Sequence, residues 1–281
     1  MLMGLGCNAA AIVGCRIIDS PRERLIAILT NAFVPCNGRF PALIAVISMF
    51  FTYSAFASGA LAGAVMLTAL LIVSVAATLL CGRLLSRTLL KGEQSSFTLE
   101  LPPYRLPSLH NMLTHVWQKV KGFLVKAGTL ILLMSMVLWL LQSFDFSLHM
   151  VENEADSMLG ALGSVIAPIF KPLGFGFWQA AVALLTGLIA KEMVVSSLSM
   201  FYGFALTAPS AQVAAAMTGF TPLSALSMLV FILLYVPCVA AVSTLAKEMN
   251  SMKWTLFSIG WQLGVAYVAS LLVYQVGSLF L

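Results

Sequence analysis

The stretch from Leu223 to Ala246 reads LSALSMLVFILLYVPCVAAVSTLA. It is apolar and long enough to cross a bilayer, which takes about 20 helical residues, but Pro237-Cys238 interrupts it. Proline removes a backbone donor and breaks the helical hydrogen-bond ladder. In lipid, the backbone groups freed by such a break are tolerated only where they line a cavity or pack against protein. The stretch therefore predicts a membrane helix that is broken inside the protein.

The rest of the chain has the composition of a membrane protein. Of its 281 residues, 60% are hydrophobic and only 9% are charged, against about 25% charged residues in soluble domains. Five cysteines are too few, and odd in number, for a secreted disulfide scaffold, and the apolar content excludes disorder. At about 20 residues per span, the length allows roughly six to eight crossings. We therefore expect an all-α, polytopic membrane protein.

The charges fall mostly in loops, where they orient the chain. Residues 83–126 carry seven basic and two acidic side chains, which marks a cytoplasmic segment, whereas the loop 145–157 is acidic and is placed outside. The net charge of +5 thus reflects loop bias and not a nucleic-acid patch. The short basic loop 247–253 is placed inside, so an odd number of crossings must separate it from 145–157. Two apolar stretches, 178–202 and 222–246, lie between them, and we expect one to be re-entrant or split.

Apolar side chains also recur at helical spacing within the cytoplasmic segment, at Leu109, Met112, Leu113, Val116, Trp117 and Val120. Ser108 is placed to cap this helix. An apolar stripe with basic residues off the stripe is typical of an amphipathic helix on the membrane surface. Residues 123–144 then form the clearest transmembrane span.

The break at Pro237 has a counterpart near the N-terminus. Phe33-Val34-Pro35-Cys36 and Tyr235-Val236-Pro237-Cys238 match as aromatic-Val-Pro-Cys, and each interrupts an apolar segment. Four residues can match by chance, and two unrelated proline kinks are the alternative interpretation. Paired broken helices in the two halves of a chain are nonetheless the best sequence pointer to the midplane site of a transporter.

Blocks of sequence in a fixed order cover nearly the whole chain. They are Gly4–Asn8 with Arg16, Asp19–Leu25, Pro35–Pro41, Leu99–Pro107, Lys126–Thr129, Thr186–Glu192, Pro237–Cys238, and Lys247–Ser251 with Lys253 and Trp254. Together they resemble the bacterial ferrous iron transport protein B (FeoB) family. The resemblance implies a multi-pass protein of the bacterial cytoplasmic (inner) membrane with two gate-like halves. Residues 1–82 would form the first half, 83–122 a cytoplasmic loop and amphipathic helix, and 123–281 the transmembrane region with the second half.

The resemblance also implies Fe2+ as the transported substrate, with Cys7, Cys36 and Cys238 along its path. Fe(II) is a borderline cation that binds thiolate, imidazole and carboxylate ligands. Glu192 is the fourth candidate ligand, because a carboxylate at membrane depth costs roughly 2.5–3.5 kcal/mol and normally faces protein or water. The competing interpretations are that buried cysteines act as small hydrophobes and that Glu192 belongs to an ion pair. Its neighbour Lys191 is a poor partner, because adjacent residues do not face each other on a helix.

Arg39 is the other charge beside a break, and it is expected either to satisfy freed carbonyls or to lie near the path. The family carries an N-terminal GTP-binding domain, and this sequence has no Gly-x-x-x-x-Gly-Lys-Ser/Thr phosphate loop. We therefore expect no GTP site and no enzymatic activity in this chain. Its expected partners are the lipid bilayer and a separately encoded GTP-binding domain or small accessory protein. A homo-oligomer is compatible with the sequence.

Two alternatives to transport stay open. A non-transporting remnant or an accessory membrane subunit shares every residue observation except completeness. A nucleoside-type transporter also uses gate-like helical repeats, but it needs polar residues for ribose and base at the breaks, where this chain has thiols. A membrane enzyme is the weakest candidate, because no nucleophile and base converge in the sequence. Ala9-Ala10 stand where the family usually has Val-Pro, a difference that bears on how Cys7 is presented.

Overall fold

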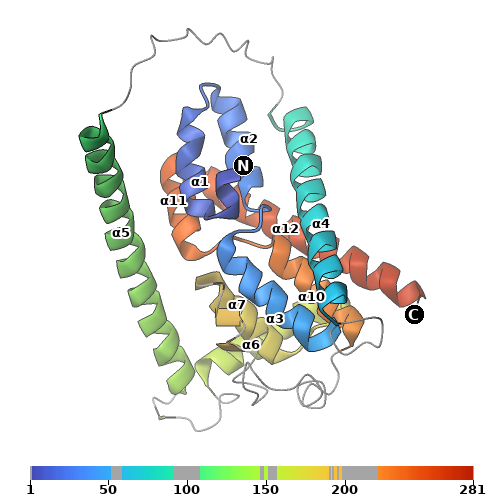
Figure 1. Ribbon diagram of the computed structural model, residues 1–281. Coiled ribbons are helices and arrows are strands. Elements are labelled where there is room, and N and C mark those ends of the chain that lie inside the picture. The colour runs from blue at the N-terminus through green and yellow to red at the C-terminus, as the bar shows by residue number, and fades with distance from the viewer. Residues whose placement is uncertain are drawn as a thin grey trace.

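The computed structural model describes residues 2–51, 59–90, 108–145, 149–150, 157–189, 191, 193–194, 196–197 and 221–280. These residues form helices and, apart from one isolated bridge between Phe144 and Met150, no β-structure, which confirms the all-α prediction (Figure 1). In chain order, the elements are η1 (Leu2–Leu5), α1 (Asn8–Gly14), η2 (Cys15–Ile17), α2 (Pro21–Asn31), η3 (Asn37–Arg39), α3 (Phe40–Phe51), α4 (Gly59–Arg87), α5 (Leu109–Ser143), α6 (Met158–Phe170), η5 (Lys171–Leu173), α7 (Trp178–Ile189), α10 (Pro222–Leu234), α11 (Val239–Met249) and α12 (Met252–Phe280).

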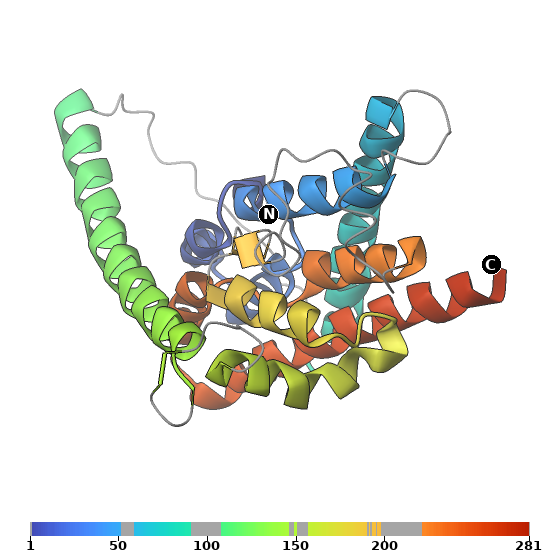
Figure 2. The ribbon, with the colours of Figure 1, turned by 90° about the horizontal axis from the view of Figure 1, so that it is seen from below.

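Helix α10 lies at the centre of the molecule. It packs against α12, α3 and α4, and nearly all of its residues are buried. Figure 2 shows the long helices α4 and α5 on opposite sides of the molecule, with α12 running across it. In the candidate spans, 72% of the α10–α11 window is buried, but only 22% of the window in α4 or in α12. The outer helices expose large apolar side chains, among them Val65, Leu80 and Leu272. An apolar exterior around a packed centre is the arrangement expected of a protein surrounded by lipid.

Within the described residues, three helical segments are long and apolar enough to cross a membrane. They are Gly63–Arg87, Pro222–Met249 and Met252–Leu279, and a fourth is counted if the bent pair of Met158–Leu173 and Trp178–Ile189 forms one span. That pair bends by 103°. The shorter apolar helical segments among the described residues are Asn8–Ile17, Asn37–Ile47 and Leu132–Ser143.

Both predicted helix breaks are confirmed. Helix α2 ends at Asn31 and α3 begins at Phe40, with only the short η3 between them. Helix α10 ends at Leu234 and α11 begins at Val239, so the stretch 222–246 is split as expected. Ser20 caps α2 by accepting a hydrogen bond from the Glu23 amide, and Pro21 takes the first helical position.

The bend between α6 and α7 has a local cause. Gly174 adopts the left-handed conformation with φ +85°, which only glycine takes without strain. A Cβ atom there would also lie 2.0 Å from the ring of Tyr274 on α12. A turn with this geometry and this close an approach requires glycine.

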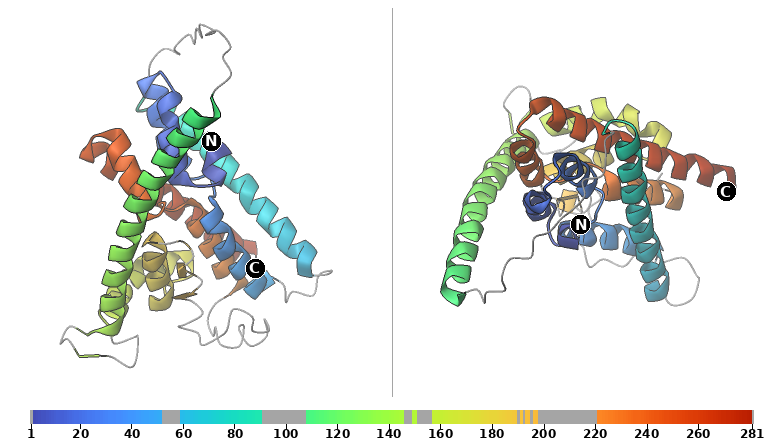
Figure 3. Two further views of the ribbon diagram at one scale, coloured as in Figure 1. Left: turned by 60° about the vertical axis from the view of Figure 1, so that its left-hand side comes forward. Right: turned by 90° about the horizontal axis from the view of Figure 1, so that it is seen from above.

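Helix α5 differs from the sequence prediction. The predicted amphipathic helix and the predicted span at 123–144 are parts of one helix, and Ser108 makes no side-chain cap. Helix α5 contacts α6, α7 and α11, and its N-terminal end extends away from the other helices (Figure 3). The predicted apolar stripe is exposed along this end, for example at Leu109 and Trp117. The proposed domain limits at 82 and 122 fall inside α4 and α5 and stay a prediction.

Candidate functional site

The three predicted cysteines each lie at the start of a helix. Cys7 precedes α1, Cys36 precedes η3 and Cys238 precedes α11. Each is the N-cap residue, each is a free, half-buried thiol, and none uses its side chain as a cap. All three thiols therefore lie where the helical backbone is interrupted and remain available for other contacts.

Backbone and amide contacts hold the segment before α1 against the first break. The amide of Asn37 donates to the Gly6 carbonyl at 3.3 Å, and Asn31 Nδ2 donates to the Asn8 carbonyl at 3.1 Å. Cys7 and Cys238 also pack against one small apolar cluster, which α1, α2 and α11 form from Ala9, Ile12, Ile28, Ala241 and Leu245. The fold thus brings the ends of three distant segments into one region.

Arg39 joins the two breaks directly. Its side chain is fully buried; Nη1 donates to the carbonyls of Ala32 at 2.6 Å and Leu233 at 2.8 Å, and Nη2 donates to that of Tyr235 at 2.7 Å. These carbonyls lie at the C-terminal ends of α2 and α10, where a helix leaves its last oxygens unpaired. The first of the two expected roles of Arg39 is confirmed, and the side chain serves both breaks at once.

Lys191 provides a second buried cation at the second break. It is 4% exposed, and its Nζ donates to the Val236 carbonyl at 2.6 Å. The same nitrogen lies 3.3 Å from the centre of the Tyr235 ring, a cation–π geometry. Sequence reasoning considered Lys191 only as a poor partner for Glu192. The carbonyls freed by Pro237 were the signal that a buried cation was needed nearby.

Arg39 and Lys191 lie close enough to interact electrostatically with each other and with both Cys36 and Cys238. The two cysteines at the matching breaks therefore share one charged environment. The described residues offer no carboxylate to these cations as an ion-pair partner. Their neighbours include the thiols of Cys36 and Cys238 and, beneath Lys191, the ring of Tyr235.

The proposed ligand set stays a prediction. Glu192 lies outside the described residues. Among the residues that the structure does describe, no group of three or more His, Cys, Asp or Glu side chains is close enough to hold a metal ion. Beside Cys7, the amide of Asn8 is 3% exposed, and neither of its side-chain polar atoms has a partner in the described part of the chain.

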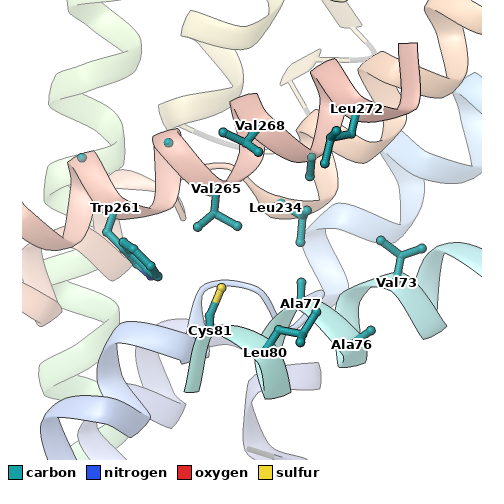
Figure 4. Close-up of a pocket in the computed structure, with 13 residues that line it drawn as sticks. Val73, Ala76, Ala77, Leu80, Cys81, Leu234, Trp261, Val265, Val268 and Leu272 are labelled. Atoms are coloured by element: carbon teal, nitrogen blue, oxygen red, sulfur yellow. The ribbon is translucent and has the colours of Figure 1, made fainter. Parts of the chain in front are cut away.

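The other two cysteines are not at the breaks. Cys15, the C-cap residue of α1, donates from Sγ to the Ala11 carbonyl at 3.3 Å. Cys81 points into an apolar groove of about 560 Å³ between α4 and α12, with Leu234 and Trp261 also on its walls (Figure 4). The lining is almost entirely hydrocarbon, so the groove suits apolar chains and not an ion.

One exposed ion pair also joins the two halves. Arg16 donates from Nη2 at 2.7 Å and from Nε at 2.8 Å to the Glu248 carboxylate, which links the end of α1 to the end of α11. Glu248, in the predicted basic loop 247–253, is thus the partner of Arg16.

Comparison with known proteins finds two family models within the chain, and the second of them includes Lys191 and Cys238. The family model described as "Ferrous iron transport protein B C terminus" matches residues 67–119. The Gate family model, described as "Nucleoside recognition", matches residues 124–252. No solved structure matches the chain.

Curated relatives match over almost the whole chain. The "Fe(2+) transporter FeoB" of Staphylococcus aureus (strain COL) is 37% identical over 280 residues, which is 100% of this chain and 40% of the relative. The protein of that name in Salmonella typhi is 32% identical over 99% of this chain and 42% of its own length. A "Fe(2+) transport protein A/Fe(2+) transporter FeoB fusion protein" of Porphyromonas gingivalis is 30% identical over 100% of this chain and 37% of its own length. The chain spans about two fifths of the length of these relatives. By these matches the chain belongs to the FeoB family, in which it corresponds to the C-terminal part.

Proposed function

We propose that this chain is the transmembrane core of an Fe2+ transporter, in which Fe(II) passes inward between two gate halves. The halves are residues 1–82 and the second gate within 123–281. Cys36 and Cys238 bind the ion transiently, with Cys7 and Glu192 as further ligands. One observation carries the proposal: Arg39 fastens the two cysteine-bearing breaks to each other through the carbonyls of Ala32, Leu233 and Tyr235.

The chemistry of the breaks supports this assignment. Thiolates suit a borderline cation such as Fe(II), and broken helices are the usual place for ion sites in transporters. Three thiols at helix starts, not engaged in capping, are the side chains that this region offers to a metal. The names of the relatives, which are Fe2+ transporters, agree with that cargo.

Transport in this proposal requires partners. Energy coupling comes from a GTP-binding domain supplied by another chain, and this chain itself catalyses no reaction. A small accessory protein is a further partner, and the relative that fuses Fe(2+) transport protein A to the transporter supports it. The exposed apolar helices support a lipid bilayer as the surroundings of this chain, and we take that bilayer to be the bacterial cytoplasmic membrane.

Fe(II) uptake into iron-starved cells that lack their own transporter tests the proposal. The chain is expressed together with a separately supplied GTP-binding domain of the family, and radioactive iron uptake is measured. We expect uptake that is lost in Cys36→Ser and in Cys238→Ser but retained in Cys81→Ser, whose thiol lines a separate groove. No uptake by the intact chain, while a full-length family member restores it, would favour the non-transporting remnant or accessory subunit.

A nucleoside-type transporter is the second candidate, because the family model that covers residues 124–252 is described as nucleoside recognition. Competition separates the two functions. Excess uridine or adenosine should leave Fe(II) uptake unchanged, and labelled nucleosides should not accumulate. Accumulation of a labelled nucleoside that depends on this chain would favour the second candidate.

A further inference from the structure

The end of α10 presents a row of backbone oxygens to cations. The carbonyls of Leu233 and Tyr235 bind Arg39, and that of Val236 binds Lys191. A helix C-terminus carries partial negative charge, and unwound carbonyls at such ends coordinate the transported cations in known transporter folds. The second break therefore has the character of a cation site, and two side chains of the protein already occupy it.

The two occupants are held very differently. Arg39 makes three hydrogen bonds to carbonyls of two helices, through two nitrogens of a rigid planar group. Within the described part of the chain, Lys191 makes one hydrogen bond and one contact with an aromatic face. A lysine ammonium is a compact charge on a flexible four-carbon stem. Of the two cations, Lys191 is the one that can leave without dismantling the break.

We propose that the Lys191 ammonium is a built-in competitor of the transported cation: it occupies the cation position beside Cys36 and Cys238, and the ion must displace it to bind. This inference rests on the proposed function, because it names the residue that sets the affinity and selectivity of that same site. It concerns only Lys191 and leaves the cysteine ligands as proposed above.

The charge of an ion determines whether it can displace the Lys191 ammonium. The Coulomb attraction between a monovalent ion and the thiols and carbonyls is no stronger than that of the tethered ammonium. For a divalent ion at the same distance, this attraction is about twice as strong. The site therefore exchanges one positive charge for two and favours divalent ions over Na+ and K+. With no metal bound, Lys191 also keeps the Val236 carbonyl satisfied, which avoids the cost of an unpaired buried oxygen.

Substitution of Lys191 by Met tests this in the full-length chain in membranes. Under anaerobic conditions, thiol alkylation at Cys36 and Cys238 is followed by peptide mass spectrometry against Fe(II) concentration. We expect the Fe(II) concentration for half-protection to fall by at least about fivefold in Lys191→Met, the usual lower range of coupling between two ligands. Lys253→Met, which removes an exposed lysine, should leave it unchanged. A purely structural Lys191 predicts an unchanged or higher midpoint, and either result overturns the proposal.

A second measurement uses the unaltered chain, in case Lys191→Met does not fold. Lys191 is nearly inaccessible, so its reductive methylation should be slow without metal and should rise as Fe(II) protects the two thiols. Methylation that stays unchanged while the thiols become protected overturns the competitor role alone. If Fe(II) protects neither cysteine in the unaltered chain, the proposed function fails and this inference with it.

Discussion

The two helix breaks share a sequence pattern but differ in their electrostatics. At each, an aromatic-Val-Pro-Cys segment ends a helix and places the cysteine at the start of the next one. Three residues after the cysteine, the first break has Arg39 and the second has Ala241. Arg39 serves the carbonyl of its own break and two of the other. The first break therefore supplies a cation, and the second receives one from the first half and one from Lys191.

This difference shows how an approximate repeat builds a single site. Two symmetric breaks would each need their own cation, or would each leave carbonyls unpaired in a lipid-surrounded core. Here the two breaks differ three residues after the cysteine, where only the first has an arginine. Arg39 ties the two breaks together, because the carbonyls of the second break also depend on it. Substitutions that change one break, or one contact between the breaks, separate these contributions.

Arg39→Ala should have the largest effect, because it makes the first break resemble the second. Three buried carbonyls lose their donor, at about 1–3 kcal/mol each, so we expect about 4 kcal/mol or more of lost stability. Thermal unfolding in detergent measures this, and alkylation of Cys36 and Cys238 should become faster as the breaks separate. Arg83→Ala, at an exposed site, is the matched control. Equal unfolding temperatures for the two variants would show that Arg39 does not hold the breaks together.

Tyr235→Leu should have the next largest effect, and it acts on the second break alone. It removes the ring beneath the Lys191 ammonium, a contact that is worth about 2 kcal/mol when desolvated. Tyr235→Phe keeps the ring, and the hydroxyl has no hydrogen-bond partner in the described part of the chain, so this variant should unfold close to the unaltered protein. If both variants lose the same stability, the hydroxyl and not the ring supports Lys191.

Asn31→Ala tests the contact between the first break and the segment that carries Cys7. Its side chain donates to the Asn8 carbonyl and so helps to hold the segment that carries Cys7. Loss of this buried hydrogen bond should cost about 1 kcal/mol and should raise the alkylation rate of Cys7 more than that of Cys238. Asn111→Ala, on the exposed part of α5, provides the control. Unchanged labelling of Cys7 would mean that other contacts place this segment.

Arg16→Ala should have the smallest effect on stability. The Arg16–Glu248 pair also joins the two halves, but the Arg16 side chain is 60% exposed, and exposed pairs are screened by water and salt. We expect a small drop in the unfolding temperature at low salt that disappears in high salt. A drop as large as that of Arg39→Ala would reverse the order of importance of the buried and exposed links.

The sequence predicted where the helices break better than it predicted which side chains bind the carbonyls at those breaks. Both breaks follow from proline, whose effect on a helix is local, and the need for a donor beside them followed from the same reasoning. That Arg39 would reach Leu233 and Tyr235 depends on how α3 packs against α10, almost 200 residues apart in sequence. Lys191 was missed for the same reason: its partners, Val236 and Tyr235, are neighbours only in the folded chain.

Other predictions differed from the structure because one stretch of sequence can carry the signals of two different elements. The apolar stripe and the basic residues of 109–120 indicated a separate surface helix, but no residue between it and the span stops a helix, and α5 continues through both. Ser108 has the right type and position for a cap, yet a cap requires a rotamer that the sequence does not specify. The role of Glu192 stays a prediction, since it lies outside the described residues.

In the proposed function, the cysteines of the two joined breaks bind the iron ion. X-ray absorption at the iron edge tests it most directly, on the purified full chain loaded anaerobically with one equivalent of Fe(II). We expect sulfur scattering around the iron that falls in Cys36→Ser and in Cys238→Ser and stays the same in Cys81→Ser. Iron surrounded only by oxygen or nitrogen in the unaltered chain would contradict it.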